Sequence, residues 1–237
     1  MRIVTWNCQG AFRKKADAIL SLTPDVLVVQ ECEHPDKLKF SSSLAIPKDF
    51  YWYSDAGKKG IGIFSYCDFK FELLPQFNPE FRYILPFNLK NDIFNFRFFA
   101  IWAMNNKENY DARYIGQIWL AINYYQNLLN DSTILIGDFN SNKIWDYKGR
   151  VGNHTDVVNL LKEKNIYSVY HKQYEIEHGK ETHPTLFMYR KEEKPYHIDY
   201  CFMSEKLIKS VEKVEIGAHE KWSVLSDHSP LAVELDL

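Results

Sequence analysis

The chain has 237 residues, enough for one large domain or one and a half average ones, and a formal net charge of −2. Its content of 46% hydrophobic and 25% charged residues is that of an ordinary folded protein, which excludes a disordered, collagen-like or coiled-coil chain. The near-neutral charge also argues against a protein that coats nucleic acid through charge alone, although it leaves room for local basic patches.

No linker rich in Ser, Gly or Pro divides the sequence, so we expect a single domain over residues 1–237. No apolar run approaches the roughly 18 residues of a membrane span, and the first residues lack the pattern of a signal peptide. The four cysteines are scattered, with no C-x-x-C spacing that would indicate a zinc or redox motif. A reducing, cytoplasmic setting without a membrane span fits these features best.

The first predicted element is a strand over residues 2–6, where Ile3 and Val4 favour extended backbone. A helix is predicted over 14–22, with Pro24 just beyond its end. Residues 25–30 form an apolar run with no polar face, which predicts a strand buried deep in a sheet.

The middle of the chain predicts strands over residues 51–54 and 61–66, joined as a hairpin by 55–60, and further strands over 69–74, 83–89, 94–104 and 133–137. Between the last two, the helical period of apolar residues predicts an amphipathic helix over 113–130. Thr155 is the expected N-cap of a helix that runs to about residue 165. Strands over 197–203, 211–216 and 231–237 complete the chain. Many strands without steady βα alternation indicate an α+β fold with packed sheets.

Polar residues stand at or near the ends of several of these apolar strands. They are Asn7, Glu31, Asp138, Asn140, Asp199, Asp227 and His228. Each one alone is explained as well by a turn former, a solvated charge or an ordinary histidine. Together these seven residues favour a functional site, because side chains at strand ends are both rigidly held and reachable from solvent.

These residues lie in five short motifs, TWNCQG (5–10), VVQE (28–31), IGDFN (136–140), HIDY (197–200) and SDHSP (226–230). The ordered set resembles the endonuclease/exonuclease/phosphatase superfamily, the fold of pancreatic deoxyribonuclease, apurinic endonucleases and inositol-phosphate phosphatases. The resemblance implies a four-layer α/β/β/α sandwich of two packed, mainly antiparallel sheets, with the site at one edge of both.

The resemblance also implies roles for the polar residues, and the chemistry of phosphoester hydrolysis supports them. Glu31 is the expected primary ligand of Mg²⁺, for which Mn²⁺ could substitute, and Asn7 and Asp227 would complete or support that ligand shell. Gln9 stands where some relatives carry an acidic ligand, so a second carboxylate is absent there.

The other members of the set are expected to carry out the catalytic steps. Asp138 would orient and deprotonate the attacking water, and Asn140 would hold that water or a phosphate oxygen. Asp199 would fix the tautomer of His228, which would then donate to the phosphate or act as the base. The sequence does not decide between Asp138 and His228 as the base.

The strand over residues 94–104 lacks the histidine that the deoxyribonuclease and phosphatase branches usually carry there. Trp102 and Asn105 instead copy the spacing of a tyrosine and an amide in the apurinic-endonuclease branch, and core packing explains Trp102 equally well. Further candidates for gripping a substrate are the lysines of the 57–62 turn, Arg113, Tyr114, Lys148, Arg150 and the aromatic stretch 145–147, all of which have ordinary surface or packing explanations. Cys8 is expected to be a small buried apolar residue.

The sequence therefore predicts a divalent-metal-dependent phosphoester hydrolase, in first place a phosphodiesterase or nuclease that acts on nucleic acid or nucleotides. The alternative is a phosphatase or phosphodiesterase for a small phosphorylated molecule, such as an inositol phosphate or a lipid headgroup. A catalytically dead binding module is the least favoured hypothesis, because the polar residues at the strand ends are all present. The sequence gives no indication of the oligomeric state.

Overall fold

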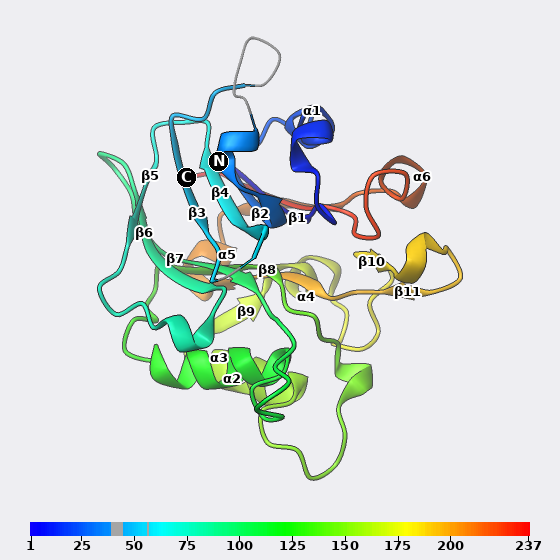
Figure 1. Cartoon of the computed structure of the whole chain (residues 1–237). Coiled ribbons are helices and arrows are strands. Elements are labelled where there is room, and N and C mark those ends of the chain that lie inside the picture. Colours follow the sequence, from blue (N-terminus) through cyan, green and yellow to red (C-terminus); the bar gives the residue numbers. More distant parts are fainter. Residues whose placement is uncertain (39–44, 56) are drawn as a thin grey trace.

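Most strands bury both of their faces, so each strand needs packing partners on two sides. In the computed structural model, which describes residues 1–38, 45–55 and 57–237, two six-stranded sheets pack face to face and helices cover their outer sides (Figure 1). This arrangement confirms the predicted α+β class and the four-layer α/β/β/α sandwich.

The first sheet has the strand order β13-β14-β1-β2-β4-β3, and β1 and β2 are its parallel pair. Its strands are β1 (Arg2–Asn7), β2 (Val26–Glu33), β3 (Asp49–Tyr53), β4 (Lys59–Ser65), β13 (Val211–Ile216) and β14 (Leu231–Leu235). The short helices near its outer face are η1 (Phe12–Lys14), α1 (Ala16–Leu20), η2 (Pro35–Lys37) and α6 (His219–Trp222).

The second sheet has the order β5-β6-β7-β8-β12-β9, and β7 and β8 are its parallel pair. Its strands are β5 (Lys70–Leu73), β6 (Ile84–Lys90), β7 (Asn95–Trp102), β8 (Thr133–Asp138), β9 (Ile166–Ser168) and β12 (Asp199–Ser204). The other elements are η3 (Pro79–Phe81), α2 (Ile115–Tyr124), η4 (Lys143–Trp145), α3 (His154–Glu163), α4 (Val169–Tyr174), β10 (Leu186–Phe187), η5 (Met188–Arg190), β11 (Pro195–Tyr196) and α5 (Glu205–Ile208).

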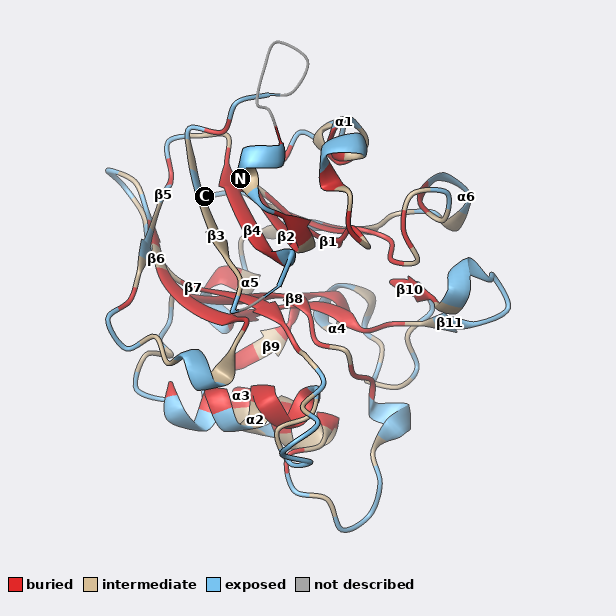
Figure 2. Cartoon of the chain, viewed as in Figure 1, coloured by how far each residue is buried: buried red, intermediate tan, exposed pale blue. Residues whose placement is uncertain are grey.

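The core has three parts, because alternate residues of a strand point to opposite faces. Ile3 and Val28 of the first sheet meet Phe98 and Ile136 of the second between the sheets. Their sequence neighbours pack outward, against α1 and η1 in the first sheet and against α2 and α3 in the second. Figure 2 shows the buried strands enclosed between helices that are exposed on their outer side.

All three predicted helices differ in their limits from the observed ones. The helix expected over 14–22 is shorter, because a 3-10 turn precedes α1 and Thr23 has a positive φ of 49°. The helix expected over 113–130 spans only α2, because Tyr114 has a φ of 49° and the chain turns after Tyr125. Thr155 is not an N-cap: Asn153 caps α3 in a capping box with Asp156.

Most predicted strands are confirmed within a few residues, whereas β9, α4, α5, α6 and the β10–β11 ribbon were not predicted. The connection expected over 55–60 contains residue 56, which lies outside the described residues. None of the helices in the described parts of the chain combines the length and apolar character that crossing a lipid bilayer requires.

Candidate active site

An open cleft of about 380 Å³ lies at the edge of the sandwich where β1 and β2 of one sheet and β7 and β8 of the other end. Both pairs are parallel, so the carboxyl ends of all four strands open to this edge. The cleft is lined by Asn7, Glu31, Trp102, Ala103, Met104, Asn105, Tyr114, Asp138, Asn140, Leu186, Met188, Tyr189, Asp227 and His228. Nine of the predicted site residues are in this set.

Asp138 is fully buried at the floor of the cleft, where β8 ends. Its Oδ2 accepts hydrogen bonds from Asn7 Nδ2 (3.0 Å) and Asn140 Nδ2 (3.1 Å), and its Oδ1 accepts one from the Asn140 backbone N–H (2.8 Å). The side chain and the backbone N–H of Asn140 can both point to Asp138 because the Asn140 backbone is left-handed, with φ 47°. The amide of Asn7 thus joins the two sheets, and the three contacts fix the carboxylate rigidly.

His228 and Asp199 form a second buried pair beside Asp138. Nδ1–H of His228 donates to Asp199 Oδ2 (2.9 Å), which leaves Nε2 facing Asp138 Oδ2 at 4.0 Å. An oxygen atom can bridge two groups at this separation with hydrogen bonds of about 2.8 Å to each. The indole of Trp6 donates to the carbonyl of His228 (2.9 Å), and the hydroxyl of Ser226 accepts from its backbone N–H (3.1 Å).

The buried surroundings shift the pKa values of Asp138 and His228. Burial first, and then the charge of Asp199, raise the pKa of Asp138 above the usual carboxyl range. Burial by itself favours the neutral ring of His228, but the adjacent charges of Asp199 and Asp138 outweigh it and raise the pKa of the imidazole. The arrangement therefore favours an imidazolium at His228 and gives Asp138 a higher affinity for protons than an exposed aspartate has.

Glu31 reaches the cleft through an irregularity in β2. The strand does not end at residue 30 as expected but continues to Glu33, and its register with β4 shifts between Val29 and Cys32. Glu31 lies within this bulge with φ 57°, and a bulge of this kind re-aims a side chain. Its Oε2 accepts a hydrogen bond from Lys59 Nζ (2.5 Å).

Three residues that line the cleft carry oxygen donors of the type that a hard divalent cation takes. Glu31 and Asp227 offer carboxylates and Asn7 offers an amide oxygen, and Mg²⁺ binds one or two carboxylates while it keeps several waters. Gln9 does not join this set, because its Oε1 accepts hydrogen bonds from Nε (3.1 Å) and Nη2 (2.5 Å) of Arg190. Cys8 is fully buried, and burial raises the pKa of its thiol to about 12, so it offers no thiolate ligand.

The candidate substrate residues are divided between the cleft and its surroundings. Trp102 lines the cleft and also packs on Tyr83 in the core, with ring centroids 4.7 Å apart. Its position is therefore compatible with both explanations that the sequence offered, substrate binding and core packing. Arg113 is not among the lining residues: its Nε donates to the carbonyl of Asn106 (2.6 Å). Arg150 Nη2 donates in turn to the carbonyl of Arg113 (3.0 Å).

The remaining predicted candidates lie outside this cleft. Trp145 packs on Tyr196, and the hydroxyl of Tyr147 contacts that of Tyr110 at 2.5 Å. Lys148 is exposed.

Several residues that shape the site were not predicted. The hydroxyl oxygen of Thr185 accepts the backbone N–H groups of Ile198 and Asp199 (both 2.9 Å), and its carbonyl accepts from Ser229 N–H (2.8 Å). Thr185 therefore positions the segments that carry Asp199 and His228. Residues 183–196 have no regular periodicity, so no sequence signal indicated that they fold back over the cleft.

The chain is similar to solved structures of this architecture. A 3' phosphatase, NExo, from Neisseria bound to a product DNA hairpin has a TM-score of 0.69 at 18% identity, with 100% of each chain covered. The endonuclease domain of TRAS1, a telomere-specific non-LTR retrotransposon, has a TM-score of 0.68 at 15% identity over 100% of this chain and 98% of that one. An AP endonuclease from Archaeoglobus fulgidus has a TM-score of 0.66 at 16% identity, with 100% of each chain covered. These identities support a shared fold.

No curated protein matches the sequence. The profile of the Endonuclease/Exonuclease/phosphatase family matches residues 4–228, which contain four of the five motifs, the first three residues of the fifth and every residue of the candidate site. The match also supports the expectation of a metal-dependent phosphoester hydrolase. The chain belongs to the Endonuclease/Exonuclease/phosphatase family.

Proposed function

We propose that the protein is a Mg²⁺-dependent phosphodiesterase that cleaves nucleic acid by attack of an activated water. The observation that carries the proposal is the pairing of Asp138 with His228 across a 4.0 Å gap that opens into the cleft. One side of the gap is a carboxylate that accepts protons, and the other is an imidazole that donates them. Hydrolysis of a phosphodiester requires both functions, together with a cation at the phosphate.

Asp138 is the proposed general base. Its raised pKa brings its proton affinity closer to neutral pH, which improves proton transfer from water. Asn7 and Asn140 hold the carboxylate in one orientation, so the accepting oxygen does not have to be organised during the reaction.

His228 is the proposed donor to the phosphate. Asp199 accepts its Nδ1–H and stabilises the imidazolium, so Nε2–H is directed to the cleft, where negative charge grows on the phosphate oxygens. Glu31, with Asn7 and Asp227, would hold a cation that would further neutralise that charge.

Exposed aromatic rings at the opening of the cleft support a polynucleotide substrate. Tyr189 is 72% exposed and Tyr114 is 39% exposed, and both line the cleft. Large exposed rings beside a phosphate site can stack on bases, which contributes about 1–3 kcal/mol per base. The NExo structure holds a DNA hairpin, and two other similar structures are of AP endonucleases, which supports DNA as the first substrate class to test.

The experiment is a cleavage assay with Mg²⁺ or Mn²⁺ on single-stranded DNA, plasmid, abasic duplex, 3'-phosphorylated DNA, RNA, cyclic dinucleotides and inositol phosphates. The His228→Ala variant serves as the control for contaminating nucleases, and His34→Ala, at a half-exposed position near η2, serves as the matched control. We expect cleavage of a polynucleotide that persists in His34→Ala and is lost in His228→Ala. Activity on inositol phosphates alone would replace the proposal with the small-molecule alternative, and inactivity on every substrate would favour a binding module.

Tyr189→Ala tests the stacking contribution separately from the chemistry. We expect the KM for single-stranded DNA to rise by the factor that corresponds to a loss of about 1–3 kcal/mol of binding free energy, because a stacking surface is removed. The rate on bis(p-nitrophenyl) phosphate, which has no base, should not change. Tyr124→Ala, at a 55% exposed position on α2, is the matched control. An equal loss of activity on DNA and on bis(p-nitrophenyl) phosphate would show that Tyr189 does not act by stacking on a base.

A further inference from the structure

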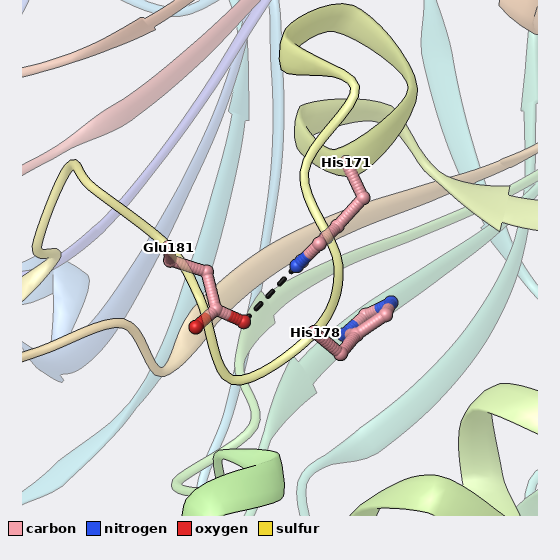
Figure 3. A group of neighbouring side chains, drawn as sticks. All are labelled: His171, His178 and Glu181. Carbon is pink, nitrogen blue, oxygen red and sulfur yellow. Dashed lines mark hydrogen bonds and ion pairs between the residues drawn. The ribbon is translucent and has the colours of Figure 1, made fainter.

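Five of the chain's eight histidines gather in one region formed by α3, α4, the loop after α4 and the segment before β12. They are His154, His171, His178, His183 and His197. None of them lines the catalytic cleft. Within this region one ring nitrogen each of His171 and His178 and a carboxylate oxygen of Glu181 lie within 4.8 Å of one another (Figure 3).

Neighbouring polar groups hold these three side chains, and His178 Nδ1 lies 3.0 Å from His154 Nε2. His171 Nε2 lies 3.0 Å from Glu181 Oε1, and its Nδ1 lies 2.7 Å from the hydroxyl of Ser168. The carboxylate of Glu181 also accepts hydrogen bonds from Gly179 N–H (2.9 Å) and Asn142 Nδ2 (3.1 Å). Hydrogen bonds to the second nitrogen of a histidine and to a carboxylate are the outer contacts that orient metal ligands in proteins.

The charge balance of the cluster favours a cation. The side chain of Glu181 is only 4% exposed and that of His171 only 8%. Within the described parts of the chain, no lysine or arginine forms an ion pair with Glu181. A buried carboxylate is costly unless a positive charge compensates it, and a divalent ion between the two histidines and Glu181 would do so.

The cluster is accessible from solvent on one side. His171 and His178 line an open pocket of about 440 Å³, together with Ser168, Lys172 and Glu177 among others. This pocket shares no lining residue with the catalytic cleft. An ion can therefore enter here, and a water can complete its coordination.

We propose that His171, His178 and Glu181 bind one divalent transition-metal ion of the Zn²⁺ type, at a site separate from the catalytic cleft. Imidazole nitrogen suits Zn²⁺, Ni²⁺ or Cu²⁺, whereas Mg²⁺ prefers oxygen ligands only. Ligands at about 2.0–2.1 Å from a tetrahedral Zn²⁺ are about 3.3 Å apart, close to the 3.0 Å between His171 and Glu181. The rings of His171 and His178 stack with 16° between their planes, so His178 must rotate to aim its nitrogen at the same ion.

The metal would connect α4 to the loop that follows it, because His171 lies on α4 and the other two ligands on that loop. Asn142, which donates to Glu181, also donates to the carbonyl of His197 (2.9 Å). Asn142 and His197 each lie two residues from a catalytic candidate, Asn140 and Asp199. The ion would thus stabilise the outer support of the catalytic residues without taking part in their chemistry.

The test is a titration of the chelator-treated full-length protein with Co²⁺, followed by displacement with Zn²⁺, in excess Mg²⁺ so that the catalytic cleft is saturated. We expect one equivalent of Co²⁺ to bind at micromolar or lower concentration, with the visible absorption of a tetrahedral site that Zn²⁺ abolishes. The His178→Gln and Glu181→Gln variants should bind about 100-fold more weakly or not at all, because each lacks one ligand.

Two further variants make the outcome specific. His34→Gln removes a histidine outside the cluster and Glu31→Gln removes the proposed Mg²⁺ ligand, and both should bind Co²⁺ as the wild type does. Circular dichroism identifies any variant that has not folded, and the two single-ligand variants are independent of each other. The proposal is overturned if the wild type binds no Co²⁺, if folded His178→Gln and Glu181→Gln bind normally, or if Glu31→Gln abolishes the signal. None of these measurements depends on hydrolytic activity, so the outcome is independent of the proposed phosphodiesterase function.

Discussion

Four residues around the catalytic cleft have left-handed backbone, although none of them is glycine. Glu31, Tyr114, Asn140 and Tyr189, which all line the cleft, have φ values between 47° and 61°. Each such residue costs roughly 1–3 kcal/mol, and such residues persist only where surrounding contacts maintain them. At Glu31 and Asn140 the conformation directs the side chain to the place where the proposed function needs it.

Asp138→Asn should lower kcat by about 10³-fold or more, because the amide cannot accept the proton of the attacking water. The fold should persist, since asparagine has the same shape as aspartate and Asn140 can still donate one of its hydrogen bonds to the residue at position 138. Steady-state kinetics together with thermal unfolding test both statements. Asp68→Asn, in the turn before β5, is the matched control. A fully active Asp138→Asn would transfer the role of base to His228.

Glu31→Gln should raise the Mg²⁺ concentration at half-maximal activity by about tenfold or more, because the strongest anionic ligand is lost. A Mg²⁺ titration of the initial rate measures this shift, and Glu72→Gln on β5 is the exposed control. An unchanged titration curve would remove Glu31 from the ligand set.

At the scale of the elements, β8 depends on one glycine. A Cβ at Gly137, which has φ +146°, would lie 1.9 Å from the carbonyl oxygen of Ile101 on the neighbouring β7. Gly137→Ala should therefore lower the free energy of unfolding by more than about 2 kcal/mol. Gly149→Ala is the matched control, because φ is +94° there but no atom lies within 4 Å, so its cost should be only about 1 kcal/mol. If urea unfolding showed the same loss of unfolding free energy for Gly137→Ala and Gly149→Ala, β7 and β8 would be able to separate easily.

The elements were predicted from sequence where a local pattern was sufficient. The apolar runs of β1, β2 and β8 are buried on nearly every residue, so their hydrophobicity alone identifies them. Helix limits were less accurate: Asn153 rather than Thr155 caps α3, because Asp156 completes a capping box that can form only with Asn153. The bulge in β2 was not predictable, since it arises from pairing with β4 and not from the sequence of β2 itself.

For the whole molecule, acid should destabilise the fold through buried neutral histidines. Burial lowers the pKa of His154 and of His197 to about 4 in each case, against about 6.5 in the unfolded chain. Below pH 6.5 the unfolded state therefore binds more protons than the folded state does. The stability that these groups contribute is present above pH 6.5 and is lost as the pH falls towards 4, by up to about 1.4 kcal/mol per pH unit for each.

Urea unfolding of metal-free protein between pH 7 and pH 5 measures this dependence. His197 Nδ1–H donates to the carbonyl of His183 (2.7 Å), a bond that the amide of an asparagine can also make. His197→Asn should therefore show a shallower decline of stability with pH than the wild type. If the two proteins declined equally, His197 would not contribute to the acid sensitivity.

Hydrophobic runs and short motifs were sufficient to predict the class of fold, the main strands and the polar residues at the strand ends, because they are local properties of the chain. Which of these residues meet depends on how the sheets pack in three dimensions. Asn7 and Asp138 are 131 positions apart and share a hydrogen bond because two sheets pack face to face. The histidine cluster is similar: the spacing of His171, His178 and Glu181 in the sequence does not by itself indicate a metal site, and the fold of α4 and its loop brings their side chains together. Distances between residues remote in sequence depend on how the layers pack, which no local pattern specifies.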